Sequence, residues 1–164
     1  MTKANSTWES VQGFIGKEAV LLDTKDWDRW LELYLPDCEY WIPAWRSNGT
    51  LVTDPSRELS LIYYKNRVGL EARVFRIRTG RASSANPAPR TIHLPQLVSA
   101  EVKDDAVHAR TSWIANSVLE GKVAAYFGYA EYVLQAAGDD WRIRSKKTVI
   151  LNDIIHEVLD FYNV

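Results

Sequence analysis

Several features that mark other classes of protein are scarce in this chain of 164 residues. It has one cysteine, Cys38, so no disulfide can form within the chain, and a reducing compartment is expected. The formal net charge of −1 gives no electrostatic case for binding nucleic acid or an anionic membrane. No apolar run approaches the roughly 18 residues of a membrane span, and the first residues do not resemble a signal peptide. We expect a cytoplasmic protein.

The sequence also lacks the motifs of common cofactor sites. There is no glycine-rich loop for a dinucleotide or phosphate, and no G-x-S-x-G nucleophile motif. A Rieske iron–sulfur centre needs two cysteines and two histidines, which one cysteine cannot supply. His93, His108 and His156 could in principle form a two-histidine, one-carboxylate iron site, but they are far apart in sequence. We expect neither a metal nor a cofactor in this chain.

Aromatic residues, in contrast, are abundant. Seven Trp and eight Tyr exceed what one core of this size requires. Part of this aromatic surface could serve an interface with another chain. A core that is simply rich in Trp is an equally good explanation.

The stretch from Thr91 to Asp153 has the period of two that is typical of long antiparallel strands. It predicts three or four strands with turns at Asp104-Asp105, Glu120-Gly121 and Gly138-Asp139. In the last strand, the alternation puts Ile143 and Val149 on one face and Lys146 and Thr148 on the other. A twisted sheet of such length must curve, so it has a concave face that other parts of the chain have to fill.

Two amphipathic helices are predicted before the sheet. The first has Ser6 as its N-cap, and its apolar residues are Trp8, Val11, Ile15, Ala19 and Leu22. The second is capped by Thr24, includes Trp27, Trp30, Leu31 and Tyr34, and is stopped by Pro36, which pushes Leu35 out of the helical region. This pair could lie across the open side of the curved sheet.

Shorter elements complete the prediction. Residues 39–43 read as an edge strand because Pro43 cannot donate to a ladder, and residues 59–64 read as a second strand. A third helix runs from Asn66 to Arg78 with Leu70, Val74 and Ile77 facing inward, and residues 154–159 could form a last helical turn. Together these elements predict one α+β domain spanning residues 1–164.

Four residues are candidates for acid–base chemistry inside the curved sheet. His93 at the start of the sheet, together with Asp37, Tyr40 and Tyr126, could transfer protons in an apolar cavity. The alternative for His93 is a structural histidine that is hydrogen-bonded to backbone or to a carboxylate.

A basic segment and two aromatic clusters are candidates for an interface with another protein. Residues 65–90 carry seven basic side chains against the single acid Glu71, which indicates either a docking surface or a solvated helix face. The candidate interface residues are Trp41, Trp45, Arg67, Arg73, Arg76, Arg78, Arg81, Arg90, Phe161 and Tyr162. The aromatic tail could instead close the chain's own sheet.

Several blocks of sequence resemble the small (β) subunits of aromatic-ring-hydroxylating dioxygenases, particularly the benzoate, toluate and anthranilate branch. The blocks, which span nearly the whole chain, are residues 26–28, 40–45, 54–64, 66–67, 69–71, 73–77, 79–80, 89–94, 151–153 and 158–162.

The resemblance implies a cone-shaped fold shared with nuclear transport factor 2, a curved antiparallel or mixed sheet with the N-terminal helices on its concave side. It implies an α3β3 assembly with a large (α) subunit, in which the small subunits surround a three-fold axis. The large subunit would hold a [2Fe–2S] cluster and a mononuclear Fe(II), and would receive electrons from NADH through a reductase. It would cis-dihydroxylate an aromatic carboxylate, while this chain would be structural, with no catalytic residue.

Two alternatives remain open at this stage. One is a stand-alone isomerase, dehydratase or hydrolase of the same fold, which would need an open cavity with an acid–base pair. The other is a module that binds a small ligand.

Overall fold

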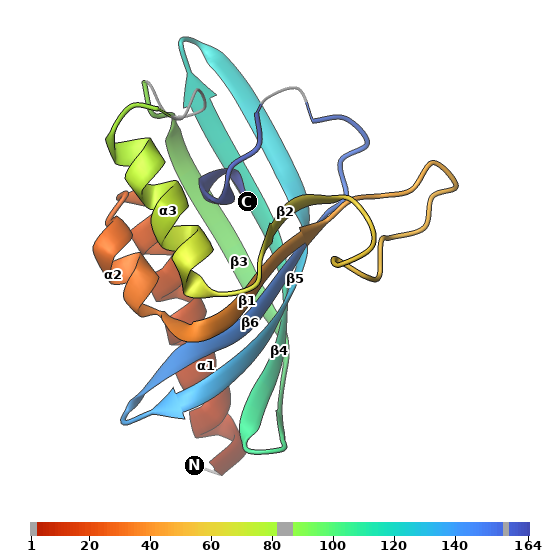
Figure 1. The fold of residues 1–164 in the computed structure, drawn as a ribbon. Coiled ribbons are helices and arrows are strands. Elements are labelled where there is room, and N and C mark those ends of the chain that lie inside the picture. The colour runs from red at the N-terminus through yellow and green to blue at the C-terminus, as the bar shows by residue number, and fades with distance from the viewer. Residues whose placement is uncertain (1–2, 82–86, 156–157) are drawn as a thin grey trace.

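The computed structural model describes residues 3–81, 87–155 and 158–164 (Figure 1). Its helices and strands are, in chain order, α1 (Lys3–Asp23), α2 (Trp27–Glu32), β1 (Tyr34–Pro43), β2 (Ser60–Tyr64), α3 (Arg67–Arg78), β3 (Arg90–Lys103), β4 (Ala106–Leu119), β5 (Lys122–Ala137), β6 (Asp140–Ile150) and the 3₁₀ turn η2 (Phe161–Asn163). The helices lie on one side of a curved sheet, and the β1–β2 connection projects beyond the other side. The predicted α+β class is confirmed.

One six-stranded sheet has the order β2-β1-β6-β5-β4-β3. All its pairs are antiparallel except β1 with β6, which run parallel. The predicted tight turns are present, and Asp104, Asp105, Glu120 and Gly121 all have positive φ. Two consecutive positive φ values match the right-handed twist of the strands that such a turn joins. The alternation thus correctly predicted β4 and β5, and the turn residues correctly predicted the connections between the strands.

β6 contains a bulge that its sequence pattern did not reveal. Val133 pairs with Ser145, but the next residue, Leu134, pairs with Ile143, so Arg144 is an extra residue in β6. One extra residue moves all later side chains to the opposite face. Lys146 and Thr148 are consequently buried on the inner face, and the prediction that they lie opposite Ile143 was wrong.

The N-terminal helices differ from the prediction at their ends. α1 already includes Ser6, which is therefore not its N-cap. Thr24 donates its hydroxyl hydrogen bond to the Val20 carbonyl, 2.8 Å away, so it closes α1 instead of opening α2. Asp26 caps α2, and its side chain accepts from the Arg29 amide.

α2 ends at Glu32, so Tyr34 lies in β1 and not in the helix. The Tyr34 ring packs on Trp30, with 4.9 Å between the ring centroids. Tyr34 also pairs with Ile143 of β6, and this tertiary contact extends the chain before the proline that was expected to end the helix.

Two further predictions about strands and turns need correction. β1 lies between β2 and β6, so it is not an edge strand; Pro43 is its last residue. The expected helical turn at residues 154–159 is not seen in the described part of that range, and residues 156 and 157 lie outside the description. Helical structure comes later, at η2. The third helix and the inward position of Leu70, Val74 and Ile77 are confirmed.

The core fills the concave side of the sheet with aromatic rings from both ends of the chain. Trp30 and Phe161 stack with 4.5 Å between centroids and an interplanar angle of 11°. Trp27 meets Phe161 edge-on at 5.6 Å. The C-terminal segment is thus part of the filling, and Figure 1 shows it between the helices and the sheet.

Replacing Phe161 should therefore destabilise the chain strongly. Phe161→Ala removes a fully buried ring and leaves a cavity, which typically costs about 3–5 kcal/mol. Phe75→Ala on the outer side of α3 is the control, and it should change the unfolding free energy by less than about 0.5 kcal/mol. Urea unfolding of the purified chain measures both; similar costs would mean that the tail is not part of the core.

Candidate functional site

A charged cluster occupies the interior of the cone. Glu18 on α1 accepts hydrogen bonds from Tyr34 at 2.6 Å, Tyr132 at 2.9 Å and Lys146 at 2.8 Å. The ammonium group of Lys146 also lies 5.9 Å from the ring of Tyr40. The cluster joins α1 to three strands, because these partners lie in β1, β5 and β6.

Glu18 is charged despite its burial. Burial raises the pKa of a carboxyl group, but here the charge of Lys146 and the three hydrogen bonds outweigh it, so the pKa of Glu18 lies below its ordinary value of 4.5. Burial and the nearby Glu18 charge raise the pKa of Tyr34 and of Tyr132 well above the usual value, so both phenols are neutral donors. The cluster is a satisfied ion pair and not a poised acid–base pair.

A second polar pair lies where α1 meets β3. Asp23 lies 2.6 Å from Nδ1 of His93 and accepts from the His93 amide at 3.1 Å and the Thr91 hydroxyl at 3.0 Å. Burial raises the pKa of Asp23, but these hydrogen bonds more than offset it and lower the pKa overall. His93 is thus hydrogen-bonded to a carboxylate, the structural alternative stated from the sequence.

The space between these two pairs is small. The cavity there, lined by Glu18, His93, Tyr132 and Lys146 among others, has a volume of about 30 Å³. Ligand pockets typically measure about 300–1,000 Å³, so an aromatic substrate does not fit. Among the other candidate acids, Asp37 is exposed, while Tyr40 and Tyr126 are buried. The interior therefore does not favour a stand-alone enzyme.

The donor set of the described residues does not fit an iron–sulfur or mononuclear iron site. No group of three His, Cys, Asp or Glu side chains in residues 3–81, 87–155 and 158–164 could hold a metal ion. Cys38 is buried, and burial raises the pKa of its thiol to about 11, which disfavours the thiolate that a metal requires. His108 is exposed, the His93 side chain is 8% exposed and bound to Asp23 of α1, and His156 lies outside the described residues. No helix in the same ranges is long and apolar enough to cross a membrane.

The six arginines of the predicted basic segment divide into two groups. Arg73 binds the buried carboxylate of Asp160 at 2.6 Å, Arg78 binds Asp28 at 2.8 Å, and Arg67 binds Glu71 at 2.9 Å. Arg73 and Arg78 therefore hold α3 to other parts of the chain, and Arg67 stabilises the first turn of α3 itself.

The second group comprises Arg76, Arg81 and Arg90, which are exposed. Among the described residues they have no ion-pair partner within 4.0 Å. They are the members of the segment whose guanidinium groups are available to another molecule.

The aromatic candidates also divide. Phe161 and Tyr162 are buried in the chain's own core, which is the alternative that was stated from the sequence. Trp41 is buried and donates to the Ser60 hydroxyl at 2.8 Å. Trp45 is exposed on the outer side and donates to the Ile150 carbonyl at 2.7 Å.

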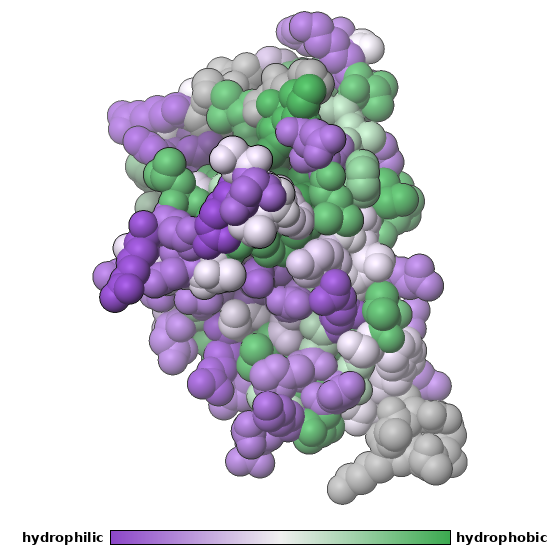
Figure 2. Space-filling model, turned by 90° about the vertical axis from the view of Figure 1, so that its right-hand side faces the viewer, coloured by the Kyte–Doolittle hydropathy of each residue, from purple (hydrophilic) through white to green (hydrophobic). Residues whose placement is uncertain are grey.

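The outer face of the sheet carries an apolar row that the sequence analysis did not single out. Leu94 pairs with Ile114, which pairs with Phe127, and all three side chains are exposed. In Figure 2, which faces this side, hydrophobic side chains gather in the upper half of the surface. The alternation already contained a sign of this row: outward positions in a strand are usually polar, but here they are apolar.

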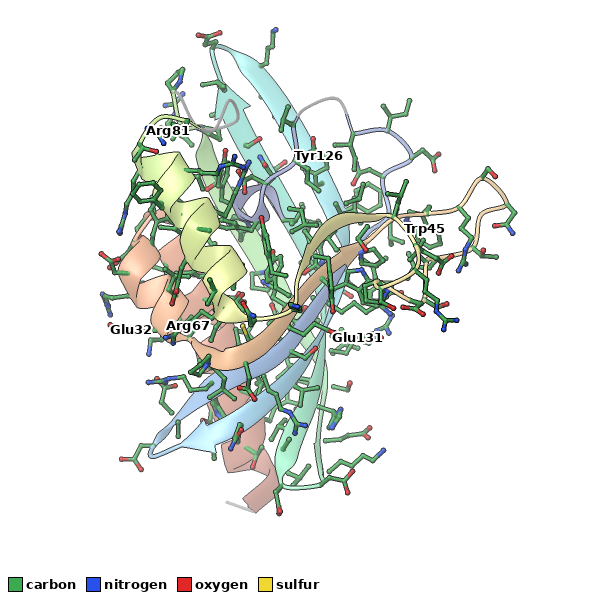
Figure 3. All side chains as sticks on the ribbon, viewed as in Figure 1. Glu32, Trp45, Arg67, Arg81, Tyr126 and Glu131 are labelled. Atoms are coloured by element: carbon green, nitrogen blue, oxygen red, sulfur yellow. The ribbon has the colours of Figure 1, made fainter. Side chains whose placement is uncertain are left out.

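Beside this row lies a charged strip on the same face. Glu131, labelled in Figure 3, binds Arg110 at 3.1 Å and Lys147 at 3.6 Å. A shallow groove of about 400 Å³ runs over these residues. An apolar centre with a polar margin is the usual composition of a protein–protein interface.

The Glu18–Lys146 pair was not predicted from the sequence. The available signal was Glu18 itself, which is a charged residue within the apolar stripe of Ile15, Ala19 and Leu22. Its partner was hidden by the bulge in β6.

The described part of the molecule is thus an α+β cone whose concave side is filled largely by its own side chains. Comparison with known proteins assigns the family. The model of the family described as "Ring hydroxylating beta subunit" matches residues 17–157, and the chain belongs to this family.

Individual relatives agree with this assignment. The chain is 46% identical to the anthranilate 1,2-dioxygenase small subunit of Acinetobacter baylyi, over 94% of this chain and 96% of that one. The crystal structure of the beta subunit of benzoate 1,2-dioxygenase from Burkholderia mallei superposes with a TM-score of 0.77 at 38% identity, covering 94% and 95% of the two chains.

The predicted fold is confirmed by a more distant structure. An NTF2-like protein with a cystatin-like fold from Novosphingobium aromaticivorans gives a TM-score of 0.64 at 17% identity, covering 97% and 92% of the two chains. At this identity, the comparison shows the fold alone.

The Glu18 cluster predicts a response to mutation. Glu18→Gln leaves Lys146 buried without a counter-charge and should cost about 3–5 kcal/mol of unfolding free energy. The double variant Glu18→Gln/Lys146→Met should cost less than Glu18→Gln alone, because it removes the unpaired charge. Lys17→Met breaks the exposed pair with Asp140 and should cost less than about 1 kcal/mol. Urea unfolding at neutral pH ranks the three.

The same cluster predicts a pH dependence. The folded-state pKa of Glu18 is depressed, so its stabilisation is present above the unfolded-state pKa near 4.5 and is lost as the pH falls through the folded-state pKa. The wild type should therefore lose stability on acidification below about pH 4.5 more steeply than Glu18→Gln. Equal slopes in denaturant titrations across this range would contradict a charged Glu18.

Proposed function

We propose that this chain is a non-catalytic structural subunit of an aromatic-ring-hydroxylating oxygenase. It binds a large subunit that holds the metal centres and performs the reaction. The observation that carries the proposal is a cone filled by its own side chains, in a chain of this family. Residues 1–164 act as one unit in this role, in the cytoplasm, without contact with nucleic acid or membrane.

The complex proposed here cis-dihydroxylates an aromatic carboxylate. The relatives in this comparison are subunits of dioxygenases named for anthranilate and benzoate, which are both aromatic carboxylates. A [2Fe–2S] cluster and a mononuclear Fe(II) belong to the large subunit, and electrons come from NADH through a reductase. The donor set of residues 3–81, 87–155 and 158–164, which does not fit either centre, supports this division.

The outer face of the sheet is the proposed contact with the large subunit. The row of Leu94, Ile114 and Phe127 is flanked by the charged strip at Glu131. Permanent interfaces are large, on the order of 2,000 Å² or more, and more apolar than transient ones. This face presents exposed apolar side chains from three neighbouring strands. Trp45 is also exposed, and it donates to the carbonyl of Ile150, next to Leu151, whose amide donates to the Phe127 carbonyl.

A second surface is proposed for contact with another small subunit. Arg76 and Arg81 lie near the C-terminal end of α3, and Arg90 begins β3. Figure 3 shows Arg81 and Trp45 on opposite sides of the molecule. A ring with three-fold symmetry needs two different surfaces on each copy, and an α3β3 assembly adds the contact with the large subunit.

The assembly itself is the first test. Co-expression with the large subunit of the same system should give a stable complex whose native mass corresponds to three copies of each chain. The purified small chain alone should bind no iron and show no turnover. Separate elution of the two subunits at micromolar concentration would overturn the proposal.

Charged substitutions test the two surfaces separately. Leu94→Asp/Ile114→Asp should abolish binding of the large subunit, while Arg76→Glu/Arg81→Glu should weaken the contact between small subunits. Val102→Asp and Lys103→Glu, at the exposed β3–β4 hairpin, are the controls and should assemble normally. All four variants change exposed side chains, so the isolated chains should keep the wild-type melting temperature. Normal hexamers from Leu94→Asp/Ile114→Asp would exclude the outer face as the interface.

A further inference from the structure

Buried polar atoms without a protein partner gather around the small cavity inside the cone. Among the described residues, the solvent-shielded side-chain atoms without a hydrogen-bond partner include His93 Nε2, Thr111 Oγ1, Trp113 Nε1 and Thr148 Oγ1. All four residues line the same cavity. Leaving one such group unpaired costs about 1–3 kcal/mol, so four around one space require an explanation.

The sheet register explains why the space exists. Thr111 pairs with Ala130, and Ala130 pairs with Thr148, so the three residues form one row across β4, β5 and β6. The small side chain of Ala130 leaves a hollow between two buried hydroxyl groups. The next row is filled by Tyr132 and Lys146, which bind Glu18. Polar groups therefore surround the hollow.

His93 presents a defined nitrogen to this hollow. The Asp23 carboxylate can only accept, so Nδ1 of His93 carries the proton of their 2.6 Å hydrogen bond. In the neutral ring, Nε2 is then an acceptor. Trp113 Nε1 is a donor, and each threonine hydroxyl can do either. An occupant must therefore both donate and accept hydrogen bonds.

We infer that this cavity is a binding site for one or two structural water molecules, held by His93, Thr111, Trp113 and Thr148. A water needs at least about 10–15 Å³ of such space and two to four polar partners, and both are present here. The Glu18–Lys146 pair in the wall is already balanced, so the site offers no net charge for an ion. The water links α1, through Asp23 and His93, to the middle of the sheet.

The direct test is a crystal structure of the full chain at a resolution that places individual waters. Density is expected within hydrogen-bond distance of His93 Nε2 and of at least one of the two threonine hydroxyls. In Thr111→Val/Thr148→Val the peak should disappear while the fold is retained. A dry cavity in the wild type, or one closed by rotated side chains, would overturn the inference.

Thermodynamic coupling gives a second, independent test. The two threonines are separated by a strand, roughly 10 Å between backbones, so their effects should add unless something bridges them. With a shared water, each Thr→Val change alone should lower the melting temperature by about 3 °C, and the double variant by clearly less than the sum. Thr111→Val combined with Thr24→Val, at the end of α1, should be additive.

A fully additive Thr111–Thr148 pair would contradict the shared water. If a valine variant does not fold, Thr148→Ser can be studied in its place. This variant keeps the hydroxyl group, so the water density should remain. Either result leaves the proposed assembly role untouched, because it concerns only the interior of the isolated chain.

Discussion

The placement of one carboxylate, that of Glu18, is the constraint on which the rest of the structure depends. A charged group taken out of water must find its full set of partners inside the protein. Glu18 finds them on three strands, through Tyr34, Tyr132 and Lys146. This fixes both the rotation of α1 about its axis and its depth in the concave face. With the helix held there and the C-terminal rings packed beside it, the cone is closed, and only its outside can interact with other proteins.

Much of the fold could be predicted because it is encoded locally. The alternation in β4 and β5, the tight turns between strands, and the inward face of α3 each depend on residues that are near one another in sequence. The bulge at Arg144 could not be predicted, because neither it nor its neighbours have a distinctive preference; the bulge satisfies a distant demand, the partner that Glu18 requires. The parallel pairing of β1 with β6 is equally non-local.

For the candidate site, composition predicted a basic and aromatic interface but not which of the basic and aromatic residues are exposed. Seven basic residues in one segment predicted available arginines, yet Arg73 and Arg78 are bound by Asp160 and Asp28 from other parts of the chain. The aromatic tail similarly turned out to fill the core. The family was identified from blocks of residues, whereas the apolar row on the outer face becomes visible only when the register aligns Leu94, Ile114 and Phe127.

The parallel pairing also has a consequence for how the chain is made. A strand in the interior of a sheet needs neighbours on both edges, and β1 finds its second neighbour in β6, about a hundred residues later. During synthesis the first third of the chain therefore leaves the ribosome before its partner exists. Contacts between such distant segments form slowly and only after most of the polypeptide has been released. Until then, the backbone groups along one edge of β1 have no strand to pair with, and an unpaired strand edge is prone to aggregation.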